Sequence, residues 1–191
     1  MRASVSNDTL SAVGRAAHDV GVSALIGGNL FARVGMHPAL REVSNPRERG
    51  SATNTAWRRY GAVNSMALAA ILVGWTGARL DEASPRMLSR RERKLAVAKD
   101  AAVVAVAVTG ISASLAGMRF ARMEPKGGVP LADGSTAAPE ATDDERRVKR
   151  LLNGLGAANL VSGVVLAGVN AGLSQANFRR PPMRRVLRRR Y

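Results

Sequence analysis

Four asparagines lie inside apolar stretches of this chain, where their amides could bind one another or line a path for a polar solute. Asn159 and Asn170 are about three helical turns apart, so they share one face of a helix. We therefore predict a polar bundle interior formed by Asn29, Asn64, Asn159 and Asn170. Hydrogen bonding between helices is the first role to expect of such amides, and a substrate or ion path is the alternative.

Two aspartates lie at the edges of apolar stretches, where a carboxylate costs less than at a membrane midplane because it can reach headgroup water. Asp100 follows Lys99 directly, and Asp19 comes one helical turn after Arg15. These membrane-edge carboxylates, Asp19 and Asp100, are therefore expected to form local ion pairs, with a proton relay as the alternative.

The two histidines are poorly placed for metal chemistry. His18 and His37 flank one helical stretch and would be roughly 30 Å apart on a helix, so they cannot bind one metal ion or flank one haem within a single chain. The chain has no cysteine, which excludes disulfides and thiolate metal sites. No nucleophile, phosphate-loop or zinc-protease motif occurs, so the sequence predicts no catalytic residue, no metal and no cofactor.

Four apolar segments must position these residues, at about 18–36, 58–79, 97–119 and 150–176. A bilayer core about 30 Å thick needs roughly 20 mostly apolar residues per helix, and the last three segments approach or exceed that length. The first segment is shorter and contains Arg33. The pattern predicts an all-α fold, a four-helix transmembrane bundle that forms one integral membrane domain over residues 1–191.

Boundary signals agree with these segments. Ser89 and Thr142 begin capping boxes and Pro46 suits a first helical position, so helices are expected to start there and to project beyond the bilayer. Residues 123–145 are rich in Gly, Pro, Ala and acids, which predicts a flexible loop.

Small residues recur along the segments at four-residue spacing, as at Ala24, Gly28 and Ala32. Lipid gives helices no hydrophobic reason to associate, so such stripes favour close helix packing, with a homo-oligomer interface as the alternative. The segments also resemble one another in pairs. Ala16–Met36 aligns with Ala96–Met118, which suggests two tandem two-helix repeats.

The formal net charge of +15 comes from bases at the ends of the apolar segments, and aromatic residues are scarce, so nucleic acid is not an expected partner. Bases are slightly more numerous beside the termini and in the 79–99 loop, which favours both termini in the cytoplasm. The basic tail, residues 178–191, is expected to contact anionic lipid headgroups or a membrane protein partner through Arg179, Arg180, Arg184, Arg185, Arg188, Arg189 and Arg190.

Ser23–Val43 is a Gly-rich span that closes in a His-Pro-Ala-Leu turn and is followed, after a polar loop, by Arg58-Arg59. This pattern resembles the first hairpin of small four-span bacterial membrane proteins of the anthrone-oxygenase-like type. No cofactor motif accompanies it, so no oxygenase activity or catalytic residue is carried over. Enrichment in Arg and Ala also indicates a high-GC bacterial genome, hence a bacterial cytoplasmic membrane.

Three functions stay open from the sequence. The first is a non-enzymatic scaffold or accessory subunit that engages lipid or a partner through its basic tail. The alternatives are a small transporter with a polar path through the bundle, and a membrane oxidoreductase that uses His18 or His37 as a ligand.

Overall fold

A computed structural model describes residues 2–81, 89–123 and 128–178 of the chain. The predicted basic tail with its arginines, and residues 124–127 of the predicted loop, lie outside the described residues. All the long elements are helices, which confirms the all-α prediction: α1 (Arg2–Phe31), α3 (Pro46–Asp81), α4 (Arg90–Arg122) and α5 (Asp143–Phe178). Between α1 and α3 the chain passes through three short pieces, a π-helical turn η1 (Ala32–Met36), α2 (His37–Ala39) and η2 (Leu40–Glu42).

Side-chain caps fix where the helices begin, as predicted. At the start of α4, the Ser89 backbone N–H donates to the Glu92 carboxylate at 2.8 Å and the Ser89 hydroxyl accepts from the Glu92 N–H, which completes a capping box. Thr142 and Glu145 form the same reciprocal pair at the start of α5. Helix α3 starts at Pro46, as expected. These caps satisfy N–H groups that a helix leaves unpaired at its first turn.

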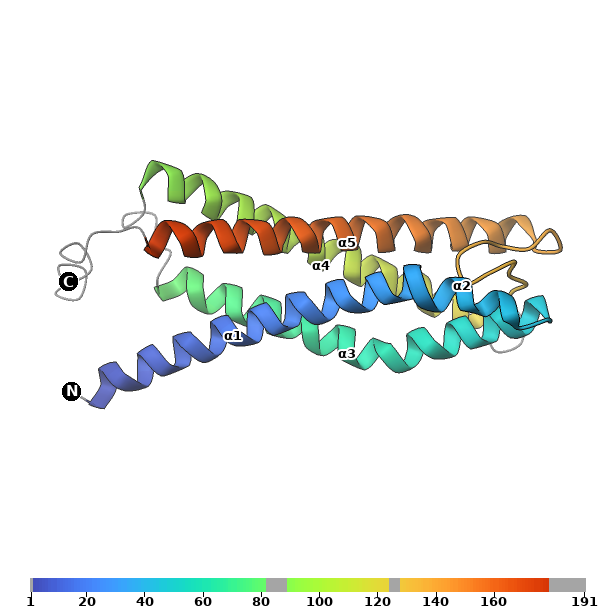
Figure 1. Cartoon of the computed structure of the whole chain (residues 1–191), viewed down its shortest axis with the longest axis horizontal. Helices are drawn as coiled ribbons and strands as arrows, with labels where there is room; N and C mark the ends of the chain where they lie inside the picture. Colours follow the sequence, from blue (N-terminus) through green and yellow to red (C-terminus); the bar gives the residue numbers. More distant parts are fainter. Residues whose placement is uncertain (1, 82–88, 124–127, 179–191) are drawn as a thin grey trace.

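The four long helices form two antiparallel hairpins (Figure 1). Helix α1 packs along α3 and α4 packs along α5, whereas contacts between the two hairpins are fewer. Helix α1 begins and α5 ends at the same end of the bundle (Figure 1). The opposite end carries the short helices and residues 128–142. We call residues 128–142 the cap.

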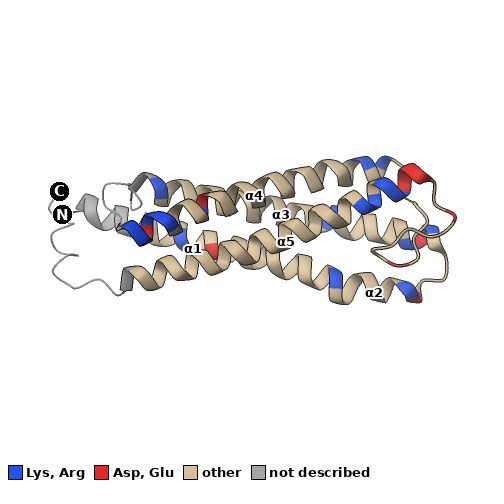
Figure 2. Cartoon of the chain, turned by 90° about the horizontal axis from the view of Figure 1, so that it is seen from above, with Lys and Arg blue, Asp and Glu red and all other residues tan. Residues whose placement is uncertain are grey.

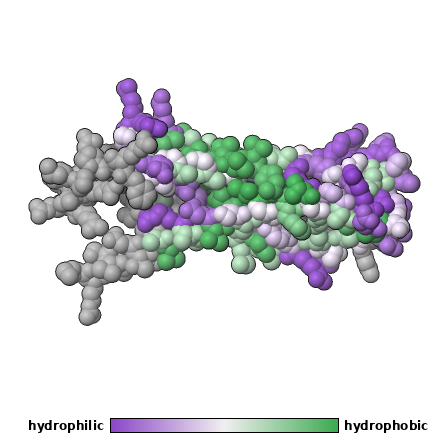
Figure 3. Space-filling view, in the orientation of Figure 1, coloured by the Kyte–Doolittle hydropathy of each residue, from purple (hydrophilic) through white to green (hydrophobic). Residues whose placement is uncertain are grey.

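Apolar side chains cover the outside of the bundle. The space-filling view shows a hydrophobic belt between two hydrophilic ends (Figure 3), and the charged residues gather toward the same two ends (Figure 2). Large apolar residues are exposed on all four long helices, among them Val20, Phe31, Met66, Val73, Val104, Val108, Ile111, Leu115, Val161 and Val164. A soluble bundle would bury such side chains, so this surface is suited to lipid.

Helices α3, α4 and α5 are each long enough and apolar enough to cross a membrane. Helix α1 does not meet the same criterion. Its apolar stretch is short and includes polar residues, among them His18 and Asn29. A fourth span along α1 therefore stays a prediction.

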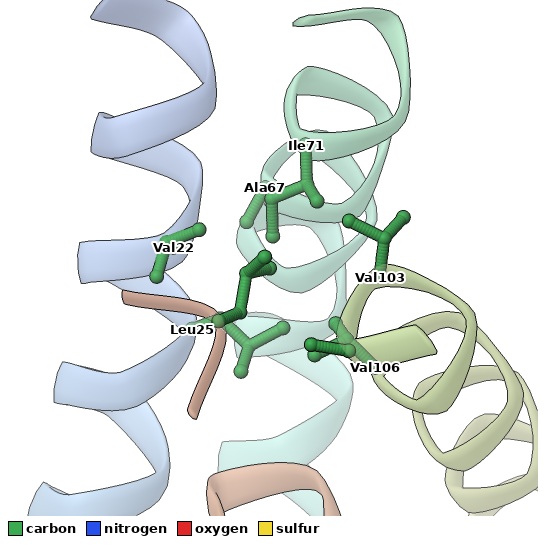
Figure 4. Packing of buried hydrophobic residues seen from close by; sticks show 8 residues of the cluster. Val22, Leu25, Ala67, Ile71, Val103 and Val106 are labelled. Carbon is green, nitrogen blue, oxygen red and sulfur yellow. The ribbon is translucent and has the colours of Figure 1, made fainter. Parts of the chain in front are cut away.

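All four long helices meet in an apolar core near the middle of the bundle. Figure 4 shows how side chains from α1, α3 and α4 point toward one another there. The buried members are small or branched, which suits close helix packing: Val22, Leu25, Ala67, Ile71, Ala102, Val103, Val106 and Leu166. This core separates the interior of the bundle into a half toward the chain termini and a half toward the cap.

The cap packs against the bundle, unlike the flexible loop predicted for residues 123–145. Val129 and Leu131 are fully buried, and they cluster with Phe120 of α4. The composition of the segment did not indicate this packing because it contains few large apolar residues. Two of them are enough, because they fill one apolar pocket at the end of the bundle.

Hydrogen bonds to backbone groups of the cap hold it in place as well. The Arg49 guanidinium on α3 donates to the carbonyls of Leu131 and Ala132 at 3.2 and 3.0 Å. The Gly134 N–H donates to the His37 carbonyl at 3.1 Å. A Cβ atom at position 134 would lie 2.6 Å from the His37 Cα, so only glycine allows this close approach. The cap thus touches both the α1–α3 connection and α3 itself.

Candidate functional site

A cavity of about 440 Å³ lies between the two hairpins in the half of the bundle toward the cap. Its volume falls within the range of about 300–1,000 Å³ that is usual for small-molecule pockets. All four long helices line it, with Leu25 and Asn29 on α1, Asn64 on α3, Gly110 on α4 and Asn159 on α5. The cavity therefore lies in the seam, the region between the two hairpins, where helix contacts are fewer than within each hairpin.

Three basic side chains line the cavity, Arg33, Arg58 and Lys149, and no aspartate or glutamate of the described residues does. Arg33 lies in the π-helical turn η1 and donates to the Asn153 carbonyl of α5 at 3.1 Å. Such π-helical turns are rare and occur frequently at functional sites. The cavity therefore has a positive wall, which suits an anionic ligand.

Lys149 is the most deeply buried of these bases, with only 4% of its surface exposed. Its ammonium group donates to the Gly134 carbonyl of the cap at 2.6 Å and lies 5.6 Å from the centre of the Phe120 ring. An ammonium group has three protons to donate. Since one of them is directed to the cap, Lys149 connects the cap to the cavity wall.

The carboxylate of Asp133 in the cap acts on Lys149 electrostatically. Asp133 is buried and accepts from the Arg41 guanidinium at 3.1 Å. Burial alone would raise the pKa of Asp133, but hydrogen bonds from Ser135, Thr136 and Arg41 hold it well below its usual value. Asp133 therefore stays ionised and fixes the cap, while it is not part of the cavity lining.

His37 also lines the cavity, close to the Trp57 ring. Its buried Nε2 atom has no hydrogen-bond partner among the described residues. Burial, assisted by the positive charge of Lys149, lowers the pKa of His37 to about 4. The imidazole is therefore neutral at physiological pH.

Three of the four predicted asparagines line the cavity, Asn29, Asn64 and Asn159. The Asn29 amide donates to Asn159 Oδ1 at 3.4 Å, and the Asn159 amide donates to the Val106 carbonyl at 3.0 Å and to the Thr109 hydroxyl at 2.9 Å. The buried Oδ1 of Asn64 has no partner within the described part of the chain. Two of these amides thus join neighbouring helices, and the third leaves its acceptor unsatisfied within the described residues.

Small residues on α4 make room for the cavity rather than for a neighbouring helix. Gly110, Ala113, Ser114 and Gly117 belong to the predicted stripes, and all four line the cavity. A Cβ atom at Gly117 would meet nothing within 4 Å. In the α1–α3 hairpin the stripes pack as predicted, because a Cβ atom at Gly28 would lie 2.2 Å from the Tyr60 hydroxyl oxygen.

No family model, curated protein or solved structure matches the chain. The resemblance of Ser23–Val43 to anthrone-oxygenase-like proteins therefore stays a prediction. His18 and His37 lie in opposite halves of the bundle, and within the described ranges no three His, Asp or Glu side chains come close enough to hold a metal ion. Function must therefore be inferred from the geometry of the cavity.

The fourth asparagine lies in the other half of the interior, toward the chain termini. Asn170 accepts from the Lys99 ammonium at 2.5 Å and donates to Asp19 Oδ1 at 2.8 Å. The Asp19 carboxylate also lies 3.1 Å from Nδ1 of His18, which is almost fully buried. This network joins α1, α4 and α5, so Asn170 links helices instead of lining the cavity.

Asp100 joins the two hairpins in the same half. Its carboxylate accepts from Trp75 Nε1 at 2.8 Å and from Arg79 Nε at 3.0 Å, both on α3. Asp100 was expected to pair with Lys99, its neighbour in the sequence. The observed partners lie more than 20 residues away along the chain, so sequence proximity could not identify them.

The convergence of three bases on one cavity could not be predicted from the sequence. Arg33 was visible as a charge inside an apolar segment, which is the usual sign of a functional group in a membrane helix. Arg58 and Lys149 lie at the ends of the predicted apolar segments, where bases are ordinary, so their sequence positions carry no such signal.

Proposed function

We propose that this chain is a small transporter, a four-span protein of the bacterial cytoplasmic membrane whose substrate binds in the cavity between the hairpins. The observation that carries the proposal is the 440 Å³ cavity lined by all four long helices. Substrate sites of transporters typically lie within the bundle, between structural repeats. A scaffold or accessory subunit needs no such internal volume, so the transporter is favoured over the scaffold.

The seam between the hairpins supports a transport mechanism. Contacts within each hairpin exceed those between hairpins, so movement at the seam disrupts less packing than movement inside a hairpin. Rocking of one repeat against the other would expose the cavity to one side of the membrane and then to the other. The cap, which contacts both α3 and Lys149 of α5, would have to change its contacts in each cycle.

The polar residues of α1 support its being the fourth span. His18 and Asn29 are buried, and Arg33 bonds to α5, whereas Val20, Phe31 and Val34 are exposed. A helix that crosses the bilayer beside others keeps its polar groups toward the bundle and its apolar groups toward lipid. The buried His18 and Asn29 fit that requirement, and Asp19, whose side chain is 60% exposed, lies at the edge of the proposed span.

The charge distribution favours both termini in the cytoplasm, which would put the cap outside. Because the chain has no native cysteine, single cysteines can report the topology. Glu140 in the cap and Arg90 at the start of α4 are both exposed. In intact cells a membrane-impermeant maleimide should modify E140C and spare R90C, and labelling of R90C alone would reverse the proposed orientation.

Filling the cavity tests the proposed function directly. Gly117→Leu places a large side chain in the cavity, whereas Gly77→Leu, on an exposed part of α3, is a matched control because a Cβ atom there also meets nothing within 4 Å. Each protein would be purified from its membrane in mild detergent and analysed by native mass spectrometry. We expect a bound small molecule on the wild type and on G77L, and none on G117L.

Equal retention of a small molecule by G117L and G77L would place the ligand elsewhere. A wild-type protein that carries no small molecule at all would count against the transporter and would restore the scaffold as the better explanation.

A further inference from the structure

The cavity is charged at one end and uncharged at the other. Arg33, Arg58 and Lys149 line it near the cap. At a rise of 1.5 Å per residue, Leu68 lies about 15 Å farther along α3 than Arg58 does. The cavity lining at that inner end includes Leu68 together with Leu25 and Val106, two side chains of the apolar core (Figure 4).

The amides at the inner end add little charge. Asn29 and Asn159 bond to each other, and Asn159 also bonds to α4, so most of their polar atoms have partners. Asn64 Oδ1 is the one buried acceptor there for which the described residues supply no hydrogen-bond donor. The inner end is therefore suited to an apolar group, and the end near the cap is suited to a negative one.

We propose that the substrate is a single-chain amphiphilic anion, with its anionic headgroup beside Arg33, Arg58 and Lys149 and its apolar chain directed toward Leu25, Leu68 and Val106. This inference rests on the proposed function and names its substrate class. A carboxylate or phosphate headgroup suits the two arginines, because guanidinium groups bind such oxygens through paired hydrogen bonds.

Charge and volume exclude other ligand classes from this role. A cationic headgroup would face three bases with no carboxylate in the lining to offset them. A neutral chain would bring no counter-charge to Arg33 and Arg58. A single chain suits a cavity of about 440 Å³ that narrows to the side chains of the apolar core.

Trp57 lines the cavity and can report occupancy, whereas Trp75 bonds to Asp100 in the other half. Trp75→Phe leaves Trp57 as the one tryptophan of the full-length chain. The variant would be placed in phosphatidylcholine nanodiscs and titrated with 2-bromododecanoate. Its bromine is next to the headgroup, hence beside Trp57, and quenches tryptophan fluorescence on contact. The neutral 2-bromododecan-1-ol and a brominated phosphatidylglycerol are the comparison probes.

We expect saturable quenching of Trp57 by the bromoacid, at least tenfold weaker apparent binding of the bromoalcohol, and no saturable quenching by the lipid. Arg58→Gln should weaken binding of the acid about tenfold. Arg59→Gln is the matched control because Arg59 is exposed, adjacent and absent from the lining. It should bind the acid as the parent does.

Equal quenching by acid and alcohol, equal effects of R58Q and R59Q, or no quenching by either single-chain probe would overturn the inference. Stronger quenching by phosphatidylglycerol would assign the site to bilayer lipid and would also overturn it. The proposed function is judged separately by the G117L and G77L proteins. A ligand that G117L loses and G77L keeps would leave the cavity as the binding site even if the amphiphile proves wrong.

Discussion

The two halves of the bundle interior contain the same kinds of residue and use them differently. Toward the termini, the carboxylates of Asp19 and Asp100 bond to neighbouring helices, and Asn170 lies between Lys99 and Asp19. Both carboxylates have a hydrogen-bond partner on another helix. This half is a polar joint that connects the hairpins.

Toward the cap, bases gather around a space instead of around acids. Arg33, Arg58 and Lys149 line the cavity, and in the described part of the chain no carboxylate lines it with them. A cavity whose lining carries charge of one sign suits an anionic ligand. Polar residues inside the bundle therefore point to a ligand site only once their partners are known.

Small residues provide the strongest test of this contrast. A Cβ atom at Gly74, in the half toward the termini, would lie 2.5 Å from the Gly14 carbonyl oxygen of α1. Gly74→Ala should therefore force α1 and α3 apart and lower the free energy of unfolding by about 3 kcal/mol, at the upper end of overpacking effects. The measurement is an unfolding titration with sodium dodecyl sulfate in mixed micelles.

Gly117→Ala is the matched control in the half toward the cap. Its Cβ atom meets nothing within 4 Å, so the variant should be as stable as the wild type or slightly more stable, because alanine favours helix. If both variants lose stability equally, glycine serves packing in both halves and the contrast fails.

The polar joint predicts a second, smaller effect. Asp100→Asn removes the charge that accepts from Arg79 and Trp75, whereas Asp144→Asn breaks a pair with Arg119 at the bundle surface. Side-chain exposure is 27% for Asp100 and 56% for Asp144, so solvent screens the second pair more. We expect D100N to lose about 2 kcal/mol, as for hydrogen bonds to charged groups, and D144N less than about 1 kcal/mol.

The same titration in mixed micelles measures both variants. An equal loss from D100N and D144N would mean that the Asp100 network contributes no more than a surface ion pair. Another interaction would then have to account for how the helices are held together in the half toward the termini.

Local sequence signals predicted the helices well because those signals are local in origin. A capping box such as Ser89 with Glu92 involves residues three apart, so its spacing alone identifies the helix start. The length and composition of α3 to α5 likewise indicate spans without any knowledge of packing. The sequence also placed Asn29, Asn64 and Asn159 in the interior, since amides avoid lipid.

The rest depends on contacts between distant segments. The cap is held by Val129 and Leu131, whose burial requires Phe120, and by Arg49, which donates to cap carbonyls from α3. The composition of residues 123–145 does not indicate those partners. The positive wall of the cavity was hidden for the same reason, because Arg58 and Lys149 become informative only when the bundle brings them beside Arg33.

The pH dependence of stability offers the smallest and most specific test of the half toward the cap. With a folded-state pKa of about 4 against an ordinary value near 6.5, His37 binds a proton more readily in the unfolded chain. Stability should therefore be unaffected above pH 6.5 and should fall as the pH is lowered toward 4. The effect should be modest because His37 is half-buried and water screens its charge.

Other groups around His37 do not reproduce this dependence. Lys149 on α5, with a pKa of about 8, stays protonated through the window, and Asp133 in the cap stays ionised because its pKa is held below its usual value. His37→Gln should therefore reduce the slope of the stability profile between pH 6.5 and 4.5, measured by thermal unfolding in detergent. A variant with the same slope as the wild type would show that the imidazole beside the cavity is not the titrating group.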